Sequence, residues 1–313
     1  MARKVPSIVK QIRNYTPEPI KHGFQKNVSY SQLSMFRQCP KKWSLQYKEG
    51  HKQYTPTIHT VFGTALHEAV QHYLTVMYDK SGAAADREDI IGIFQECLRT
   101  EYAKQYKKNG SHFSSPEELR EFFEDGVNII EYLKKKRGRY FSRRGTYLAG
   151  CEVPIIIAPN KRYNNVLYQG FLDVVLYHEN SDRFTIIDIK TSTKGWSAKA
   201  KKDEDKQFQL ILYKKFFSEQ FNIPLDKIDI EFFIVKRKLY ESEDYVIPRI
   251  QEFTPASGKV KMNKATRALD EFITKAFTQE GFAEVEHQPT PDNPNNNCNW
   301  CAFYKTHLCP ATF

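Results

Sequence analysis

The segment GFLDVVLYHENSDRFTIIDIKT, residues 170–191, reads as two β-strands joined by a polar turn. Both strands are rich in β-branched and aromatic residues, yet they carry Asp173, Asp188 and Lys190. Successive side chains of a strand point to opposite faces of a sheet, so Asp188 and Lys190 share one face. If the strands pair through the turn at residues 178–183, Asp173 projects toward the same face. The segment therefore predicts a hairpin with two aspartates and a lysine on one side.

A pair of buried carboxylates is unfavourable unless a cation neutralises it, because the like charges repel and each ion loses its hydration. A divalent metal ion bound between Asp173 and Asp188 would remove this cost. In a simpler interpretation, Lys190 forms an ion pair with one aspartate at the edge of the sheet. Taken alone, the three residues favour the simpler interpretation, so a metal site needs support from the rest of the chain.

The composition argues against a membrane protein. The chain has 313 residues, of which 40% are hydrophobic, enough to bury the core of one large domain. No apolar run approaches the length that crosses a bilayer, and the basic start MARKVPSIVKQIRNY lacks the apolar core of a signal peptide. We expect a soluble, cytoplasmic protein that does not bind membranes. The net charge of +10 suits a polyanionic partner, although it is also compatible with simple solubility.

The spacing of apolar residues predicts a mostly helical first half and a second half that contains strands. Helices are predicted over residues 29–48, broken at Cys39-Pro40, and over residues 63–79, 87–106 and 116–137. After a basic turn at residues 134–145 come strands in CEVPIIIA, VLYQGFLDVVLYH and RFTIIDIKT, a helix over 205–221, strands in IDIEFFIVKRK and YVIPRIQEF, and a helix over 259–280. This order indicates the α/β (α+β) class.

Three further features accompany the hairpin. The segment GTALH, residues 63–67, begins an amphipathic stripe and contains His67, although a lone helix histidine is more often a structural residue at the rim of the core. Gln209 and Tyr213 are four residues apart in a predicted helix and share one face, although they can equally be a surface and a core residue. Glu152 lies one strand earlier, where it either tunes a site or is only part of the sheet.

Together these residues resemble the core of the PD-(D/E)xK nucleases. In that family an Asp on one strand and a D-x-K or E-x-K motif on the next hold Mg²⁺ and orient a water; Gly170-Phe-Leu-Asp173 and Asp188-Ile-Lys190 match both motifs. The chain looks more specifically like the RecB-type branch shared with the Cas4 and AddB nucleases, over roughly residues 29–310. The resemblance implies a restriction-endonuclease-like core with a central mixed sheet flanked by helices, an N-terminal helical part and a C-terminal cysteine-rich cap.

The resemblance also implies roles for individual residues. Mg²⁺ or Mn²⁺ would be held by four groups: His67, Asp173, Asp188 and the carbonyl of Ile189. Lys190 would place the attacking water, either by stabilising the hydroxide or by accepting its proton. Gln209 and Tyr213 match the family's QxxxY motif and would hold the phosphate or Lys190.

The C-terminal sequence CNWCAFYKTHLCP contains Cys298, Cys301 and Cys309. In a reducing compartment such a group indicates a metal site that needs a fourth ligand. His307 is separated from Cys309 by one residue, an uncommon spacing for structural zinc, so a distant ligand is favoured. Iron-sulfur members of the family carry one cysteine in a C-P-basic context before the nuclease motifs, and Cys39 matches it. The resemblance thus implies a [4Fe-4S] cluster on these four cysteines, with Zn²⁺ as the alternative.

The resemblance suggests the following organisation along the chain. Residues 1–28 are expected to be an extended lead-in and residues 29–313 a single nuclease domain. Its parts are an iron-sulfur clasp (29–62 and 281–313), a mainly helical part (63–145) and a catalytic sheet core (146–280).

The function that the resemblance implies is that of a metal-dependent DNA nuclease, an exonuclease that acts in recombination, repair or end processing. Its substrate would be single-stranded DNA or DNA with free ends, and Trp196 with the lysines that follow it is a candidate contact. Because the chain has no helicase-like phosphate loop, any unwinding would come from a helicase or recombination protein. The alternative is a non-catalytic nucleic-acid-binding module with a zinc-stabilised C-terminus. The intact set of Asp173, Asp188 and Lys190 favours the enzyme.

Overall fold

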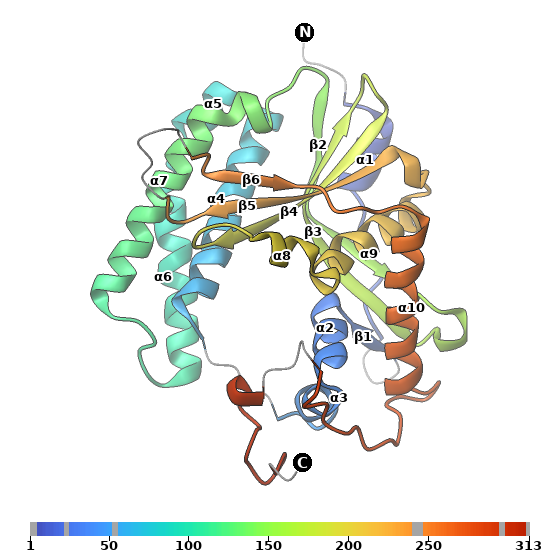
Figure 1. Ribbon diagram of the computed structural model, residues 1–313. Helices are drawn as coiled ribbons and strands as arrows, with labels where there is room; N and C mark the ends of the chain where they lie inside the picture. Colours follow the sequence, from blue (N-terminus) through green and yellow to red (C-terminus); the bar gives the residue numbers. More distant parts are fainter. Residues whose placement is uncertain (1–4, 22–24, 52–55, 240–246, 294–297, 311–313) are drawn as a thin grey trace. The chain divides into compact units, whose positions relative to one another are not determined.

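A six-stranded mixed sheet organises the chain, as the computed structural model shows for residues 5–21, 25–51, 56–239, 247–293 and 298–310 (Figure 1). Its strand order is β1-β3-β4-β5-β6, and β2 also pairs with β3. The β3–β4 and β5–β6 pairs are antiparallel, whereas β1–β3 and β4–β5 are parallel. The strands are β1 (Lys26–Val28), β2 (Thr146–Ile157), β3 (Val166–His178), β4 (Arg183–Ser192), β5 (Ile228–Lys236) and β6 (Ile250–Phe253).

The predicted helices are present in the predicted order: α2 (Tyr30–Gln38), α3 (Pro40–Trp43), α4 (Ile58–Asp79), α6 (Ile90–Asn109), α7 (Pro116–Tyr140), α9 (Glu204–Phe221) and α10 (Lys259–Ala276). Three short helices were not predicted: α1 (Ser7–Arg13), α5 (Gly82–Arg87) and α8 (Ala198–Lys202). The predicted break between the first two helical turns is confirmed, since Cys39 ends α2 and Pro40 begins α3. The predicted class, a mixed α/β fold with a central mixed sheet and flanking helices, is confirmed as well.

Two local predictions were wrong. The lead-in is not wholly extended, because α1 forms within it and buries Val9 and Ile12. The Arg13 side chain anchors this helix by donating to the Leu148 carbonyl (2.8 Å) and to Asp79 (3.0 Å). The basic stretch from residue 134 is not a turn at first, because α7 continues to Tyr140. Lysine and arginine are good helix formers and are favourable near a helix C-terminus.

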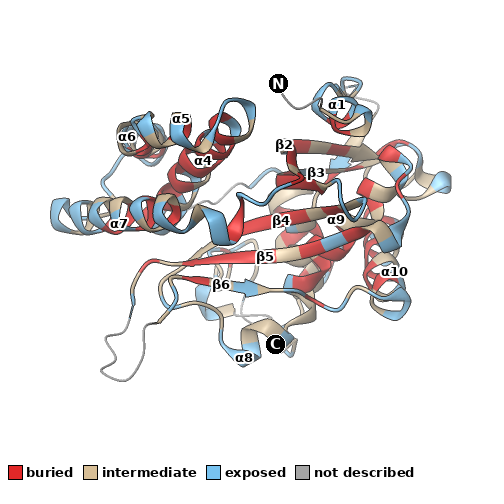
Figure 2. Cartoon of the chain, turned by 90° about the horizontal axis from the view of Figure 1, so that it is seen from above, coloured by how far each residue is buried: buried red, intermediate tan, exposed pale blue. Residues whose placement is uncertain are grey.

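Two compact units, each built from three segments, make up the chain. The first comprises Met1–Tyr15, Thr55–Val153 and Phe171–Ala256. In it, α4, α6 and α7 pack on one face of the sheet, where Ile187 and Ile189 belong to the core. Helix α9 covers the opposite face, with the rings of Phe184 and Phe217 5.6 Å apart. The buried stretches of β4 and β5 stand out in Figure 2.

The second unit comprises Thr16–Tyr54, Pro154–Gly170 and Ser257–Phe313. Its core surrounds the fully buried Trp43, whose ring contacts Phe36, Phe272 and Phe277 edge-on. Strand β1 pairs here with the first residues of β3. Among the helices of the described residues, none combines the length and the apolar surface that a bilayer crossing requires.

Candidate active site

The candidate site lies in the first unit, where strands β3 and β4 separate. Their ladder ends at the pair Val174 and Ile187, so the predicted hairpin is confirmed. Asp173 and Asp188 come next, and by alternation both belong to the face opposite the core of α4. The amide of Ile189 donates to Asp173 Oδ2 (2.7 Å), so a carboxylate accepts the bond that a partner strand would otherwise take. The side chain of Asp173 therefore sits in the opening between the strands.

Helix α4 reaches this opening because its first turns approach β4 closely. A Cβ on Gly63 would lie 3.2 Å from Thr191 Oγ1, tighter than an ordinary contact, so glycine permits the approach. His67 follows about one turn later, with Nδ1 3.7 Å from Asp173 Oδ2. The GTALH segment thus has a physical role, which is to bring the imidazole against the strand opening.

Glu152 completes a group that the sequence only partly indicated. His67, Glu152 and Asp173 each have one possible metal-ligand atom within 4.8 Å of those of the other two. Among the described residues, no other three His, Cys, Asp or Glu side chains form such a group. Glu152 has a left-handed backbone (φ +50°) although it lies in β2. In the sequence, Gly150 indicates this irregular backbone, because a glycine inside a strand pattern marks a bend or bulge. A Cβ at this position would lie 2.6 Å from the Val153 side chain.

Asp188 is buried (1% exposed), and its two carboxylate oxygens differ in their partners. Lys190 Nζ lies 2.7 Å from Oδ2 and forms an ion pair with it. Oδ1 accepts no hydrogen bond from a described residue. The simpler interpretation, an ion pair of Asp188 and Lys190, therefore accounts for Oδ2 but leaves the buried Oδ1 unsatisfied. A bound cation would satisfy Oδ1, so this donor set fits a divalent metal ion.

Burial also sets the protonation of the site. It raises the pKa of Asp188 to about 6, to which Asp173 contributes and which Lys190 opposes. Burial raises the pKa of Asp173 to about 6, although the charge of Lys190 and the hydrogen bond from the Ile189 amide both lower it. Burial lowers the pKa of His67, and Lys190 lowers it further, whereas Asp188 and a hydrogen bond to the Ile189 backbone act in the opposite direction. A neutral imidazole is the form that binds a metal ion.

These pKa directions predict how pH affects the stability of metal-free protein. The folded state binds a proton at Asp188 more tightly than the unfolded state does, so protonation of Asp188 stabilises the fold. This contribution to the free energy of unfolding is complete below the ordinary pKa of 3.8 and is lost as pH rises through about 6. We expect metal-free Asp188→Asn protein to melt at a higher temperature than wild type at about pH 8, and the difference to shrink toward about pH 5. Thermal melting in a chelator measures this, and Mn²⁺ should raise the melting temperature of wild type alone. A pH-independent difference would contradict the assigned burial cost.

Helix α9 contributes residues from the face of the sheet opposite α4, the face to which Asp173 and Asp188 belong. Gln209 Nε2 lies 3.4 Å from the Tyr213 hydroxyl, so the predicted pair does share one helix face. Tyr213 is buried, which raises the pKa of its hydroxyl, and Asp188 and Asp173 are close enough to raise it further. The QxxxY pair therefore stands beside the two aspartates.

The four predicted cysteines all belong to the second unit. Burial raises the pKa of the Cys309 thiol, and three further thiols contribute to this rise: Cys39, Cys301 and Cys298. The thiols are therefore near neighbours. No disulfide joins any of the six cysteines, all of which lie in described ranges. His307 is exposed, whereas Cys39 is buried and the other three cysteines are partly buried.

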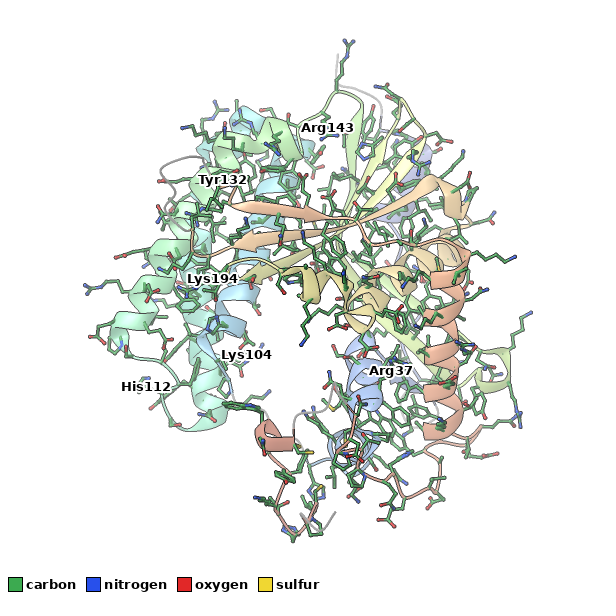
Figure 3. All side chains as sticks on the ribbon, viewed as in Figure 1. Arg37, Lys104, His112, Tyr132, Arg143 and Lys194 are labelled. Atoms are coloured by element: carbon green, nitrogen blue, oxygen red, sulfur yellow. The ribbon has the colours of Figure 1, made fainter. Side chains whose placement is uncertain are left out.

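Hydrogen bonds hold the C-terminal segment beside Cys39. Thr290 donates to the carbonyl of Gln38 (2.8 Å), and the amide of Asn293 donates to the carbonyl of Arg37 (2.7 Å), a residue labelled in Figure 3. The backbone of Lys42 donates to Cys39 Sγ (3.5 Å). The cysteine next to Gln38 is thereby fixed near the segment that leads to the other three.

The loop between β4 and α8 was predicted to contact nucleic acid through Trp196. That ring packs on Phe232, with centroids 4.8 Å apart. The side chain of Gln251 accepts a hydrogen bond from the Trp196 backbone amide and donates one to the Trp196 carbonyl. Trp196 is therefore half-buried against the sheet, which limits the ring surface that a base can stack on. Lys194, labelled in Figure 3, and Lys199 are exposed in this part of the chain.

Comparison with known proteins gives one family. Residues 27–310 match the family model of the PD-(D/E)XK nuclease superfamily. This range includes every candidate residue described above, from Cys39 to Cys309. No curated protein matches the sequence.

Proposed function

The chain belongs to the PD-(D/E)XK nuclease superfamily, and on this basis we propose that it is a metal-dependent deoxyribonuclease that hydrolyses phosphodiester bonds. One observation supports the site above all others: the buried Oδ1 of Asp188 accepts no hydrogen bond from a described residue, and Asp173 and Lys190 lie beside this carboxylate. A sheet that only needed stability would place apolar side chains at this point.

The residues proposed to hold the divalent ion are the group of His67, Glu152 and Asp173, together with Asp188 and the Ile189 carbonyl. Carboxylate and carbonyl oxygens suit both Mg²⁺ and Mn²⁺, and the imidazole favours Mn²⁺. When bound, such an ion lowers the pKa of water and neutralises charge that develops on the phosphate.

Lys190 has a second role in this proposal. Its ammonium group is the cation that faces Asp188, and it is one-third exposed, so it can also reach a water or a phosphate oxygen. Lys190 would place the attacking water and stabilise its negative charge. Gln209 and Tyr213, on α9 over the same face of the sheet as Asp188 and Lys190, hold the phosphate or orient Lys190.

We propose iron rather than zinc at the cysteines. Cys39 stands in a C-P-basic context before the nuclease motifs and the other three cysteines follow them, as in the iron-sulfur members that the chain resembles. The Cys309 thiol lies near the other three thiols, which supports a common [4Fe-4S] cluster. Its role would be to clasp the two ends of the second unit.

The proposed substrate is DNA with free ends, which makes the enzyme an exonuclease of recombination, repair or end processing, served by a helicase or recombination partner. The test is to incubate the protein with Mg²⁺ or Mn²⁺ and equal amounts of end-labelled linear DNA and closed circular DNA. We expect loss of the linear DNA only, and no reaction in a chelator. Equal cleavage of the circle would contradict the requirement for ends, and intact DNA in both arms would contradict the nuclease itself.

A further inference from the structure

Gln71 joins three elements of the candidate site through one side chain. It lies four residues beyond His67 on α4 and thus on the same face of the helix. Its Nε2 donates to Glu152 Oε1 on β2 (2.6 Å) and to the backbone carbonyl of Asp173 on β3 (3.0 Å). The side chain is 8% exposed, so water competes little for these bonds. A single amide therefore ties the helix to both strands.

Glu152 depends on such a hydrogen bond for its orientation more than His67 and Asp173 do. Its side chain is exposed, whereas His67 and Asp173 are half-buried, and a free glutamate samples many rotamers. The left-handed backbone at Glu152 turns the chain locally, but it does not fix the outer bonds of the side chain. The bond from Gln71 fixes one carboxylate oxygen in advance, so less side-chain freedom is lost when a ligand binds.

The hydrogen bond from the Gln71 amide to Glu152 is suited to a cation site. An amide donates hydrogen bonds without carrying a charge, so Gln71 adds no positive charge to the site. A lysine or arginine in the same place would hold the carboxylate equally well but would repel a divalent ion. The two carboxylates thus have different partners: Asp188 faces the cation of Lys190, and Glu152 accepts a hydrogen bond from the neutral amide of Gln71.

We propose that Gln71 is a positioning residue that sets Glu152 as a ligand of the divalent ion. This inference rests on the proposed function, since it requires that the site binds a metal ion. It assigns to α4 both a ligand, His67, and the group that orients another ligand. Gln71 itself touches neither metal nor DNA.

The test compares Gln71→Leu with wild type. We expect the dissociation constant for Mn²⁺, measured by calorimetry without DNA, to rise about tenfold, as is typical when an outer partner of a ligand is lost. The Mn²⁺ concentration for half-maximal cleavage should rise in step, and the rate should recover at saturating Mn²⁺. If Gln71→Leu does not fold, Gln71→Asn, which keeps the amide but shortens its reach, is measured against the same expectation.

A double variant separates positioning from a structural role. If Gln71 acts through Glu152, Gln71→Leu should weaken Mn²⁺ binding no further once Glu152→Gln is present. Additive losses, or a rate that stays low at saturating Mn²⁺, would overturn the inference. Gln105→Leu is the matched control, because Gln105 on α6 is equally buried (8% exposed) and also donates to a glutamate, Glu101. It should bind Mn²⁺ as wild type does.

The two proposals fail in different ways. Wild-type affinity for Mn²⁺ in a folded Gln71 variant overturns the positioning role and leaves the nuclease intact. Wild-type protein that neither binds Mn²⁺ nor cleaves DNA overturns the proposed function.

Discussion

Replacing Asp188 with alanine is expected to slow DNA cleavage at least about 1,000-fold, because the variant loses a metal ligand worth several kcal/mol of transition-state stabilisation. DNA affinity should stay within about tenfold of wild type, since it comes mainly from lysine and arginine contacts to phosphates. Single-turnover cleavage of end-labelled DNA measures the first effect, and DNA binding in a chelator measures the second.

Asp229→Ala is a matched control for this variant. Asp229 is also a strand aspartate paired with a cation, Arg183 (2.6 Å), but it lies on β5, is half-exposed and accepts hydrogen bonds from its partner. Its loss should leave the cleavage rate near that of wild type. If Asp188→Ala cleaved DNA as fast as the parent protein, with contaminants excluded, the assigned site would be wrong.

The second large effect is expected at the cysteines. A cluster that joins Cys39 to Cys298 closes a loop across 259 residues, and the chain-entropy expression gives about 5 kcal/mol for a cross-link of that length as an upper figure. Cys39→Ala should therefore lose its iron and its visible absorption. Limited proteolysis should then cut the second unit first, and cleavage of DNA should fall only indirectly.

Cys97→Ala is the control for this experiment, because Cys97 lies on α6 in the first unit, where it packs against the core. It should retain the colour, the iron content and the protease resistance of wild type. Colourless wild-type protein with one equivalent of zinc would contradict the iron-sulfur proposal.

Much of the site was predictable because its motifs are local. The two-residue period of a strand places Asp188 and Lys190 on one face, and a polar turn between two apolar runs makes the hairpin that aligns Asp173 with them. The four-residue spacing of Gln209 and Tyr213 fixes their common face in the same way. Each inference needs only the geometry of one element, or of two elements that are adjacent in sequence.

Other features depended on contacts between distant residues. The helix α1 is short and gains its stability from burial and from the Arg13 contacts, so its own residues carried little signal. The contacts of Trp196 with Phe232 and Gln251 likewise exist only in the folded sheet, and its role in DNA binding stays a prediction. In both cases tertiary packing sets the environment of the residue.

Residue spacing was enough to identify the family, most of the helices and strands, and the strand face of the acidic residues, because the backbone period fixes which residues share a face. The grouping of Glu152 with His67 and Asp173, and the hydrogen bond from Gln71 to Glu152, became visible only in the fold. Both depend on the left-handed backbone of Glu152 in β2 and on the close approach of α4 to β4. Such distances are set by packing among segments far apart in the chain, which residue spacing does not encode.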